Sequence, residues 1–271
     1  MAAELVLLRC PECRGQLAAA AGAVRCADCR AIWPLRDGTP VLYREAWVKG
    51  PDKVLRLFYD GVPRLHDPAV RFGLPLWQLG GTEEQIRRGY LRRLRLGELP
   101  RDRPVRLLEV SVGSGANIAR VRQWPGCPAQ LDYYGLDLSA GMLRLCRQRL
   151  TATGAAPVQL VQGDAHALPF ADAAFDCVLH VGGIGGFRDP ARALAEMCRV
   201  AKAGAQVVVV DEQLDPKRRH GLWPRLWFRA LTFYDDRPHC PTEALPPGVT
   251  DVVEEQLSRF YYGLSFRAPA A

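Results

Sequence analysis

The sequence predicts an α/β protein in which a doubly wound, mostly parallel sheet follows a small metal-stabilised module. Three observations lead to this prediction. From Val105 onward, short apolar runs alternate with segments of helical periodicity, the pattern of a parallel sheet with helices on both faces. The first of these runs breaks into Gly113-Ser114-Gly115, a turn that exposes backbone to a ligand. Two cysteine pairs near the N-terminus have the spacing of a zinc site.

Length, charge and cysteine content set the first bounds. The 271 residues can hold one large domain with a smaller one beside it. The formal net charge of +7 permits an anionic partner, although a modest surplus spread over a surface is common. No apolar run reaches about eighteen residues, so we expect no membrane-spanning helix. The N-terminus lacks a signal-peptide pattern, so we expect a cytoplasmic protein whose nine cysteines are thiols or metal ligands.

Residues 1–45 are predicted to form a zinc ribbon. Two C-x2-C pairs separated by twelve residues can deliver four thiolates to one tetrahedral ion, and a hairpin over residues 32–43 follows them. So short a segment cannot bury enough surface to fold alone, so metal would supply the missing stability. Because no ligand position is left for water, we expect a structural zinc rather than a catalytic one. The predicted ligands are Cys10, Cys13, Cys26 and Cys29.

Residues 46–104 are predicted to be a helical connector that covers the cofactor site. One of its helices begins after Thr82, which forms a capping box with Gln85. Apolar side chains at helical spacing should face the core, and the arginines should fill the opposite face. An RNA-binding surface is the alternative, but no aromatic residues interleave with the arginines, so we favour a solvated face. These arginines are Arg87, Arg88, Arg92, Arg93 and Arg95.

Residues 105–271 should contain the main sheet. Five strands are expected to alternate with helices, and an antiparallel pair over residues 251–267 should close one edge. Residues 213–247 are rich in aromatic residues beside arginines and are predicted to be an acceptor-side insertion, either a lid or a helix packed on the sheet. A helix should begin at Asp189-Pro190 and run through Val200, with Gly204 terminating it. The predicted strands are residues 106–112, 131–137, 158–162, 175–181 and 206–210.

Groups at successive strand ends fit an adenine nucleoside. Ligands of such sheets bind outside the carboxyl ends of the strands. Gly113 and Gly115 would present backbone to the ligand, and Asp137 could accept hydrogen bonds from both ribose hydroxyls. Asp164 could accept from the adenine amino group while the amide of Ala165 donates to the ring. A dinucleotide site is disfavoured because the third glycine of its fingerprint is absent, and a P-loop because no lysine follows the turn.

Five segments between residues 105 and 266 resemble class I S-adenosylmethionine-dependent methyltransferases, especially those of ubiquinone and menaquinone biosynthesis (methyltransferase type 11). The segments are L-L-E-V-S-V-G-S-G-A-N, G-L-D-L-S-A-G-M-L, V-Q-G-D-A-H-A-L-P-F, F-D-C-V and E-M-C-R-V-A-K-A-G-A. The resemblance implies a Rossmann-like sheet of seven strands and S-adenosylmethionine as cofactor. It also implies transfer of the cofactor's methyl group to a small-molecule acceptor by in-line displacement.

The same resemblance implies roles for particular residues. Glu109 and the two glycines of the turn would flank the methionine part, while Leu138 and Met142 would line the nucleoside. His180 would lie beside the sulfonium, and it is the candidate catalytic base. His166, Asp211 and Glu212 are further candidates, with Glu212 expected at the surface. The implied cofactor-binding residues are Glu109, Gly113, Gly115, Asn117, Asp137, Leu138, Met142, Asp164, Ala165 and His180.

The sequence departs from the family's pattern at two positions. Ser111 stands where glycine is usual, which is tolerable if its φ is negative, and Ala203 stands where proline is usual. Neither change removes a ligand group. Two alternative functions remain open: a ribosomal or transfer RNA base methyltransferase that uses the zinc ribbon for RNA recognition, and a non-catalytic cofactor-binding or scaffold subunit. The sequence predicts no oligomeric state.

Overall fold

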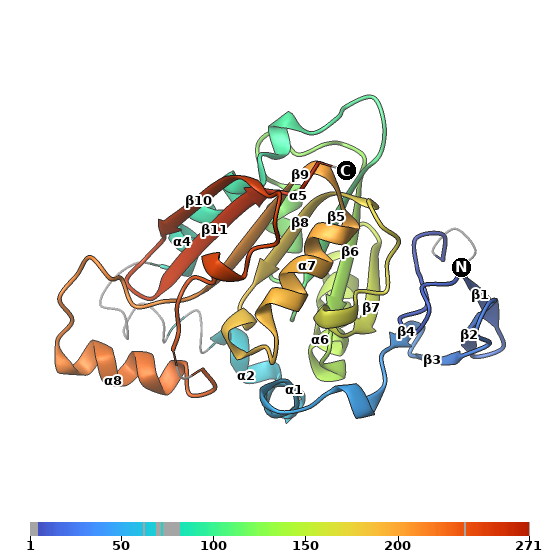
Figure 1. Cartoon of the computed structure of the whole chain (residues 1–271), viewed down its shortest axis with the longest axis horizontal. Helices are drawn as coiled ribbons and strands as arrows, with labels where there is room; N and C mark the ends of the chain where they lie inside the picture. The colour runs from blue at the N-terminus through green and yellow to red at the C-terminus, as the bar shows by residue number, and fades with distance from the viewer. Residues whose placement is uncertain (1–4, 62, 69–71, 73–81, 236, 271) are drawn as a thin grey trace.

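The computed structural model describes residues 5–61, 63–68, 72, 82–235 and 237–270. Within these residues, one continuous sheet of eleven strands forms the centre of the molecule (Figure 1). Its strands are β1 (Leu17–Ala20), β2 (Ala23–Cys26), β3 (Ile32–Arg36), β4 (Thr39–Leu42), β5 (Val105–Val110), β6 (Leu131–Asp137), β7 (Val158–Gly163), β8 (Phe175–Val181), β9 (Ala201–Glu212), β10 (Thr250–Gln256) and β11 (Tyr261–Arg267). Their order across the sheet is β1-β2-β3-β4-β7-β6-β5-β8-β9-β11-β10.

Seven of these strands make the predicted doubly wound sheet. β7, β6, β5, β8 and β9 pair in parallel. β11 pairs antiparallel with β9 on one side and with β10 on the other, which confirms the expected antiparallel pair at the sheet edge. The preceding helix ends at Val200, as predicted. The start of the strand was wrong: β9 begins at Ala201 and not at residue 206, so Gly204 lies inside the strand and does not terminate the helix.

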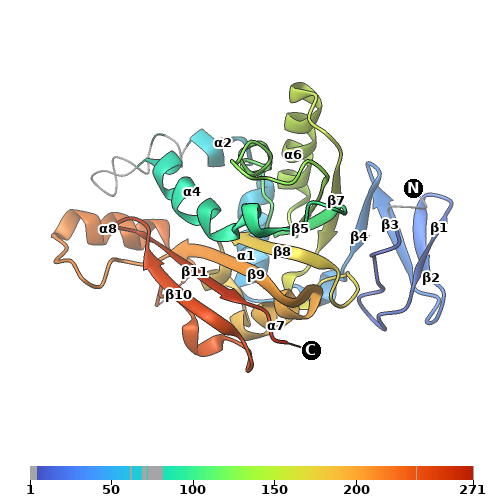
Figure 2. The ribbon, with the colours of Figure 1, turned by 90° about the horizontal axis from the view of Figure 1, so that it is seen from above.

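Helices cover both faces of the sheet. Figure 2 shows α4 and α6 on one face and α7 on the other. Thr82 forms the predicted capping box with Gln85 at the start of α4, and the side chains of Ser139 and Asp189 cap α6 and α7. No helix in the described ranges is both long and apolar enough to cross a bilayer. The helices are α1 (Pro51–Gly61), α2 (Pro63–Pro68), α4 (Glu83–Leu91), α5 (Ile118–Arg122), α6 (Ala140–Thr153), α7 (Pro190–Val200) and α8 (Leu222–Leu231).

The core is divided by the sheet because neighbouring residues of a strand point to opposite faces. In β5, Leu107 belongs to the apolar cluster under α4 and α6, whereas Leu108 belongs to the cluster under α7. Leu179 and Val178 of β8 divide in the same way. Burial on both faces explains why these strands appear in the sequence as continuous apolar runs rather than alternating ones.

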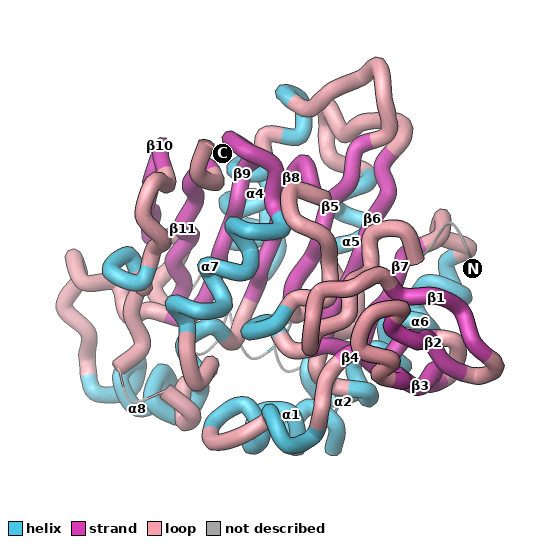
Figure 3. The backbone as a smooth tube through the Cα atoms, turned by 45° about the vertical axis from the view of Figure 1, so that its right-hand side comes forward, coloured by secondary structure: helices cyan, strands magenta, loops and turns pink. Residues whose placement is uncertain are grey.

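The N-terminal module continues the sheet rather than hanging free of it. β3 and β4 form the predicted hairpin, and β4 then pairs in parallel with β7, with Val41 opposite Gln162. Figure 3 shows the module beside the β7 edge. Trp33 of β3 is fully buried in the same apolar cluster as the strands under α7. The sheet therefore crosses the predicted boundary between the zinc ribbon and the main domain.

The predicted arginine face of α4 is only partly solvated. Arg87 is 9% exposed, and its guanidinium donates a hydrogen bond to Asn117 Oδ1 at 3.0 Å. Arg92 and Arg93 both pair with the carboxylate of Glu255 on β10. The expectation that Arg87 faces solvent was therefore wrong, because helical periodicity cannot reveal a polar partner on another element.

Candidate functional site

The first cavity lies under α1 at the carboxyl ends of β5, β6 and β7, where parallel sheets bind ligands. Its volume is about 140 Å³. Asp52, Leu55 and Tyr59 of α1 form one wall, and the strand ends form the other. The sequence-predicted residues that line this cavity are Gly113, Asp137, Leu138, Met142, Asp164 and Ala165.

Asp137 is fixed between the glycine turn and the start of α6. Its Oδ2 accepts a hydrogen bond from the Gly113 amide and its Oδ1 accepts one from the Ser139 amide, both at 2.8 Å. An ionised carboxylate oxygen can accept more than one hydrogen bond, so both oxygens can also accept from a ligand's hydroxyls. The two amides hold the carboxylate toward the cavity in a single orientation.

The turn after β5 depends on left-handed backbone. Gly113 has φ +54° and Gly115 has φ +72°, a region that glycine adopts without steric cost. A Cβ at Gly115 would lie only 2.6 Å from the Cys146 sulfur, so a larger residue would collide with α6. Ser111 also has a positive φ, +59°, so the condition under which serine replaces glycine without strain is not met. A non-glycine residue there costs about 1 kcal/mol.

A second cavity of about 550 Å³ adjoins the first. The two share Tyr59, Gly113 and Gly182 among their lining residues. Tyr234 and several apolar side chains of residues 213–247, the predicted acceptor-side insertion, line the second cavity. Its large apolar lining side chains are Phe58, Ile86, Trp227, Leu231 and Phe233.

One wall of the second cavity carries a carboxyl group held by two tyrosines. Tyr234 donates its hydroxyl to Glu212 Oε2 at 2.8 Å, and Tyr261 donates to Oε1 at 3.1 Å. Burial and the neighbouring charge of Asp211 raise the pKa of Glu212 well above its usual value. Glu212 is half-buried and lines the cavity, so the expectation of a surface acid was wrong. Its position at the end of β9 is the only sequence signal that could have placed it there.

Glu109 anchors a buried polar network behind the glycine turn. It is 1% exposed and accepts hydrogen bonds from Asn117 Nδ2 and the Tyr133 hydroxyl. Burial raises the pKa of Glu109 to about 7, although these hydrogen bonds oppose the shift. Tyr90 and Arg87 both donate to Asn117 Oδ1. The network fixes Asn117 at the start of α5, and both it and Glu109 line the second cavity.

The carboxylate of Asp164 already has protein partners. Arg188 Nη2 donates to its Oδ2 at 2.8 Å, and the backbone amide of His166 donates to its Oδ1 at 2.9 Å. Burial acts to raise the pKa of Asp164, but the contacts with His166 and Arg188 outweigh it and leave that pKa below its usual value. Arg188 also pairs with Asp52, so the guanidinium links α1 to the end of β7.

His180 does not line either cavity. Its side chain is fully buried, with Nδ1 3.1 Å from the carbonyl oxygen of Val110, and its ring lies 5.3 Å from that of Phe187. Burial lowers the pKa of His180. The following residues of the chain, Val181 and Gly182, are the ones that reach the cavities. The position of His180 thus lends no support to contact with an acceptor.

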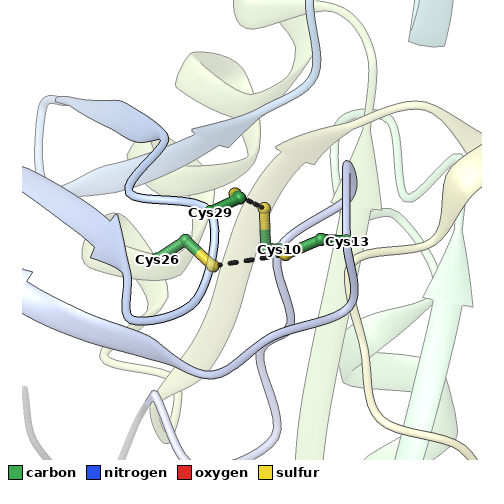
Figure 4. A group of neighbouring side chains, drawn as sticks. All are labelled: Cys10, Cys13, Cys26 and Cys29. Carbon is green, nitrogen blue, oxygen red and sulfur yellow. Dashed lines mark hydrogen bonds between the residues drawn. The ribbon is translucent and has the colours of Figure 1, made fainter.

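The four predicted zinc ligands lie together at the N-terminal module (Figure 4). All four sulfur atoms lie within 4.8 Å of one another. The Cys10–Cys29 and Cys13–Cys26 sulfur distances are 3.6 Å and 3.4 Å. A tetrahedral zinc with Zn–S bonds of about 2.3 Å places its sulfurs about 3.8 Å apart. The arrangement therefore fits a zinc ion with small outward shifts of the sulfurs.

Comparison with known proteins agrees with the fold. Residues 108–209 match the family model described as a methyltransferase domain. The protein named demethylmenaquinone methyltransferase from Renibacterium salmoninarum is 33% identical over 169 residues, covering 60% of this chain and 60% of its own. Phosphatidylethanolamine N-methyltransferase of Cereibacter sphaeroides is 35% identical over 107 residues, covering 39% of this chain and 50% of its own. The chain thus spans little more than half the length of these relatives.

Solved structures show the same architecture. Phosphoethanolamine N-methyltransferase 2 of Haemonchus contortus, in complex with S-adenosyl-L-methionine, aligns with a TM-score of 0.58 at 16% identity, covering 80% of this chain and 60% of its own. Geranyl diphosphate methyltransferase aligns with a TM-score of 0.54 at 16% identity, covering 69% of this chain and 86% of its own. At these identities the likeness concerns the fold alone. The sequence match of residues 108–209 to a methyltransferase domain and this likeness of fold therefore agree with each other.

Proposed function

We propose that the chain transfers the methyl group of S-adenosylmethionine to a small, largely apolar acceptor. The pair of adjoining cavities carries this proposal. One is lined by strand-end groups that suit a nucleoside, and the other by aromatic and aliphatic side chains. They meet at the turn after β5, so a methyl group held between them would face the second cavity. The cofactor would supply an activated methyl group on a neutral leaving group, so positioning and exclusion of water can provide most of the rate.

The first cavity is proposed to hold the nucleoside. Asp137 would accept hydrogen bonds from the ribose hydroxyls, and Leu138 and Met142 would pack on the sugar and base. Asp164 and Ala165 would face the adenine, with the carboxylate of Asp164 oriented by its existing contacts. The methionine end would extend toward the second cavity. The residues proposed there are Glu109, Gly113, Gly115 and Asn117.

The second cavity is proposed to hold the acceptor. Its walls favour an apolar or aromatic molecule. Of the carboxyl groups that line it, we assign proton acceptance to Glu212, which lies beside Tyr234 of the acceptor-side segment. In the reaction, a bond forms between the acceptor atom and the methyl carbon while the carbon–sulfur bond breaks, its electron pair remaining on sulfur. The acceptor's proton would pass to Glu212. The names of the relatives, which include a phosphatidylethanolamine and several demethylmenaquinone methyltransferases, favour lipid-like acceptors.

A labelling experiment separates the three candidate functions. The purified chain is incubated with methyl-labelled S-adenosylmethionine and cell extract divided into RNA and small-molecule fractions. Label in an organic-soluble small molecule supports the proposal. Label in RNA, with binding that falls steeply as salt rises, would favour the RNA alternative. Cofactor binding without any labelled product would indicate a non-catalytic or partner-dependent subunit.

Asp137→Ala is expected to weaken binding of S-adenosylmethionine by roughly 10- to 100-fold, about 1 to 3 kcal/mol, because it removes a charged acceptor of two ribose hydroxyls. Titration calorimetry on the purified protein measures the change. The matched control is Asp132→Ala, which removes an exposed aspartate from the other end of β6. If both variants bind S-adenosylmethionine with equal affinity, Asp137 does not contact the cofactor.

The four-cysteine cluster is proposed to hold one structural zinc. The ion would join the segment before β1 to the turn after β2, which the short strands of the module hold only weakly. Elemental analysis should find one zinc per chain, and Cys26→Ser should lose it and lower the thermal unfolding temperature by at least about 5 °C. Cys127→Ser, at a half-buried cysteine outside the cluster, should keep the zinc. A wild-type protein that is folded and free of metal would contradict the assignment.

A further inference from the structure

Two helices expose large apolar side chains on one side of the molecule. Figures 1 and 3 place α1 and α8 on the same side, beyond the strand ends. Leu222 is 71% exposed and Trp223 is 70% exposed, values far above those of side chains that pack in a core. We call these residues the apolar lip. Its six principal members are Leu57, Phe58, Leu222, Trp223, Leu226 and Trp227.

Helix α8 turns its larger apolar surface away from the protein. Only Pro224 and Phe228 of this helix are buried, with Phe228 packed on Phe260 at 5.2 Å between ring centroids. Leu222, Trp223 and Leu226 face outward instead. The lip continues onto α1, because Phe58 contacts Phe233 just beyond the end of α8 at 5.8 Å between ring centroids. A contiguous exposed patch of this kind marks an interaction surface rather than scattered exposure.

The segment that contains α8 carries mainly positive charge, with Asp215 and Asp235 at its two ends. Residues 216–234 contain five lysines and arginines and no aspartate or glutamate. Arg218 pairs with Asp215, and Arg229 donates a hydrogen bond to the carbonyl oxygen of Asp235. Arg219 and Arg225 are exposed on the same segment. Tryptophans together with arginines on an exposed amphipathic helix are typical of an element that lies in the plane of a lipid interface. Anionic lipid headgroups would complement the positive charge. The basic residues of this segment are Lys217, Arg218, Arg219, Arg225 and Arg229.

The lip also forms the rim of the second cavity. Phe58 and Trp227 belong to both, whereas Leu222 and Trp223 belong to the lip and do not line the cavity. A surface that covered the lip would therefore lie directly over the cavity's apolar wall. An apolar molecule could pass from that surface into the cavity without crossing water.

We propose that the apolar lip docks on an anionic lipid bilayer, with α8 lying in the interface and its arginines against the headgroups. The docking is peripheral, since the described helices are too short or too polar to span a bilayer. The combination of exposed tryptophans with mainly positive charge on one helix favours a lipid surface over a protein partner. Docking does not depend on the proposed methyl transfer and can be tested without an acceptor.

The test measures sedimentation of the full chain with vesicles of phosphatidylcholine alone or mixed with phosphatidylglycerol. The chain should sediment with the mixed vesicles, less so at high salt. The double variant Leu222→Asp, Trp223→Asp should have a vesicle–water partition coefficient about tenfold or more below that of the wild type, because each substitution removes an inserted apolar side chain. The control is Ile32→Asp, which changes an exposed residue of β3 that is 60% accessible and lies in the N-terminal module.

The charge contribution is tested separately. Arg219→Glu with Arg225→Glu should abolish the preference for phosphatidylglycerol, whereas Arg25→Glu, on an exposed position of β2, should not. All variants should bind S-adenosylmethionine with wild-type affinity, so a loss of docking is distinguishable from a failed cofactor site. A folded wild type that binds neither kind of vesicle would overturn the proposal. So would a dimer in solution that Trp223→Asp dissociates, because the lip would then be an interface between two copies.

Discussion

Arg188→Met is expected to lower the free energy of unfolding by about 3 kcal/mol or more at neutral pH. The guanidinium stands between Asp52 and Asp164, whose side chains are 4% and 3% exposed. Removing it leaves two buried carboxylates with only the imidazole of His166 between them, its Nδ1 2.6 Å from Asp164 and 4.0 Å from Asp52. The cost of an uncompensated buried charge exceeds what an exposed ion pair contributes. Arg88→Met, which breaks a pair with Glu84 whose side chains are 72% and 42% exposed, should cost less than about 1 kcal/mol.

The pH dependence of this deficit has a definite sign. In the native wild type the pKa of Asp164 lies below its usual value, which the unfolded chain retains. The ionised carboxylate therefore stabilises the fold fully at pH values above the usual pKa. This stabilisation is lost as the pH falls through the native pKa. Without Arg188 the native pKa of Asp164 must rise. The deficit of Arg188→Met should therefore be large at neutral pH and shrink near about pH 4, where the carboxyl can be protonated at little cost. Urea unfolding at both pH values checks this. A deficit that grows on acidification would contradict the ion-pair account.

The same ion pair bears on cofactor binding. Asp52 belongs to α1 and Asp164 to the end of β7, and both line the first cavity. Arg188 thus links α1 to the end of β7, where the adenine is proposed to lie. A variant that leaves the global fold intact but frees α1 should bind the nucleoside less tightly, since the cavity would lose one wall.

Local sequence patterns predicted most of the sheet. β6 and β8 have the predicted bounds residue for residue, and α7 begins behind Asp189 as its Asp-Pro pair indicates. These elements are recoverable because caps, prolines and apolar runs act within a few residues. The glycine turn after β5 and the strand-end acids followed from the same local signals, because the carboxyl ends of parallel strands meet at one edge.

Long-range pairing explains what the sequence did not predict. β4 pairs with β7 across more than one hundred residues, and neither strand carries a local mark of its partner. Arg87 is buried because Asn117 and Glu83 receive its hydrogen bonds, which helical periodicity cannot show. Partners from distant elements therefore decide which charged residues are buried.

Glu212 shows the functional consequence of such distant partners. An acidic residue at the end of a strand has the same sequence pattern whether it faces solvent or a cavity. Tyr234 and Tyr261, which follow it by 22 and 49 residues in the chain, turn it into a buried hydrogen-bonded carboxyl. If it takes the acceptor's proton, its ionisation must control the rate.

Glu212→Gln is expected to lower kcat by about 100- to 10,000-fold with the acceptor that the labelling experiment identifies, while affinity for S-adenosylmethionine stays unchanged. Glutamine keeps the size of the side chain and can still accept a hydrogen bond from one of the two tyrosine hydroxyls, but it cannot take a proton. The wild-type rate should rise with pH through the raised pKa of Glu212, because only the ionised carboxylate acts as a base. Glu212→Gln should lack this rise. An unchanged kcat would mean that the acceptor needs no base from this cavity.

The variant Tyr261→Phe tests whether Glu212 accepts a proton in the reaction or only shapes the cavity. The hydroxyl of Tyr261 donates to Glu212 and so lowers its pKa, opposing the effect of burial. Removing the hydroxyl should raise the pKa of Glu212 and move the rise in rate to higher pH, with the maximal rate retained. Cavity packing alone would lower the rate equally at every pH, since a lost contact with the acceptor has no proton to titrate. The displacement of the pH profile therefore distinguishes a carboxylate that receives the acceptor's proton from one that only shapes the cavity.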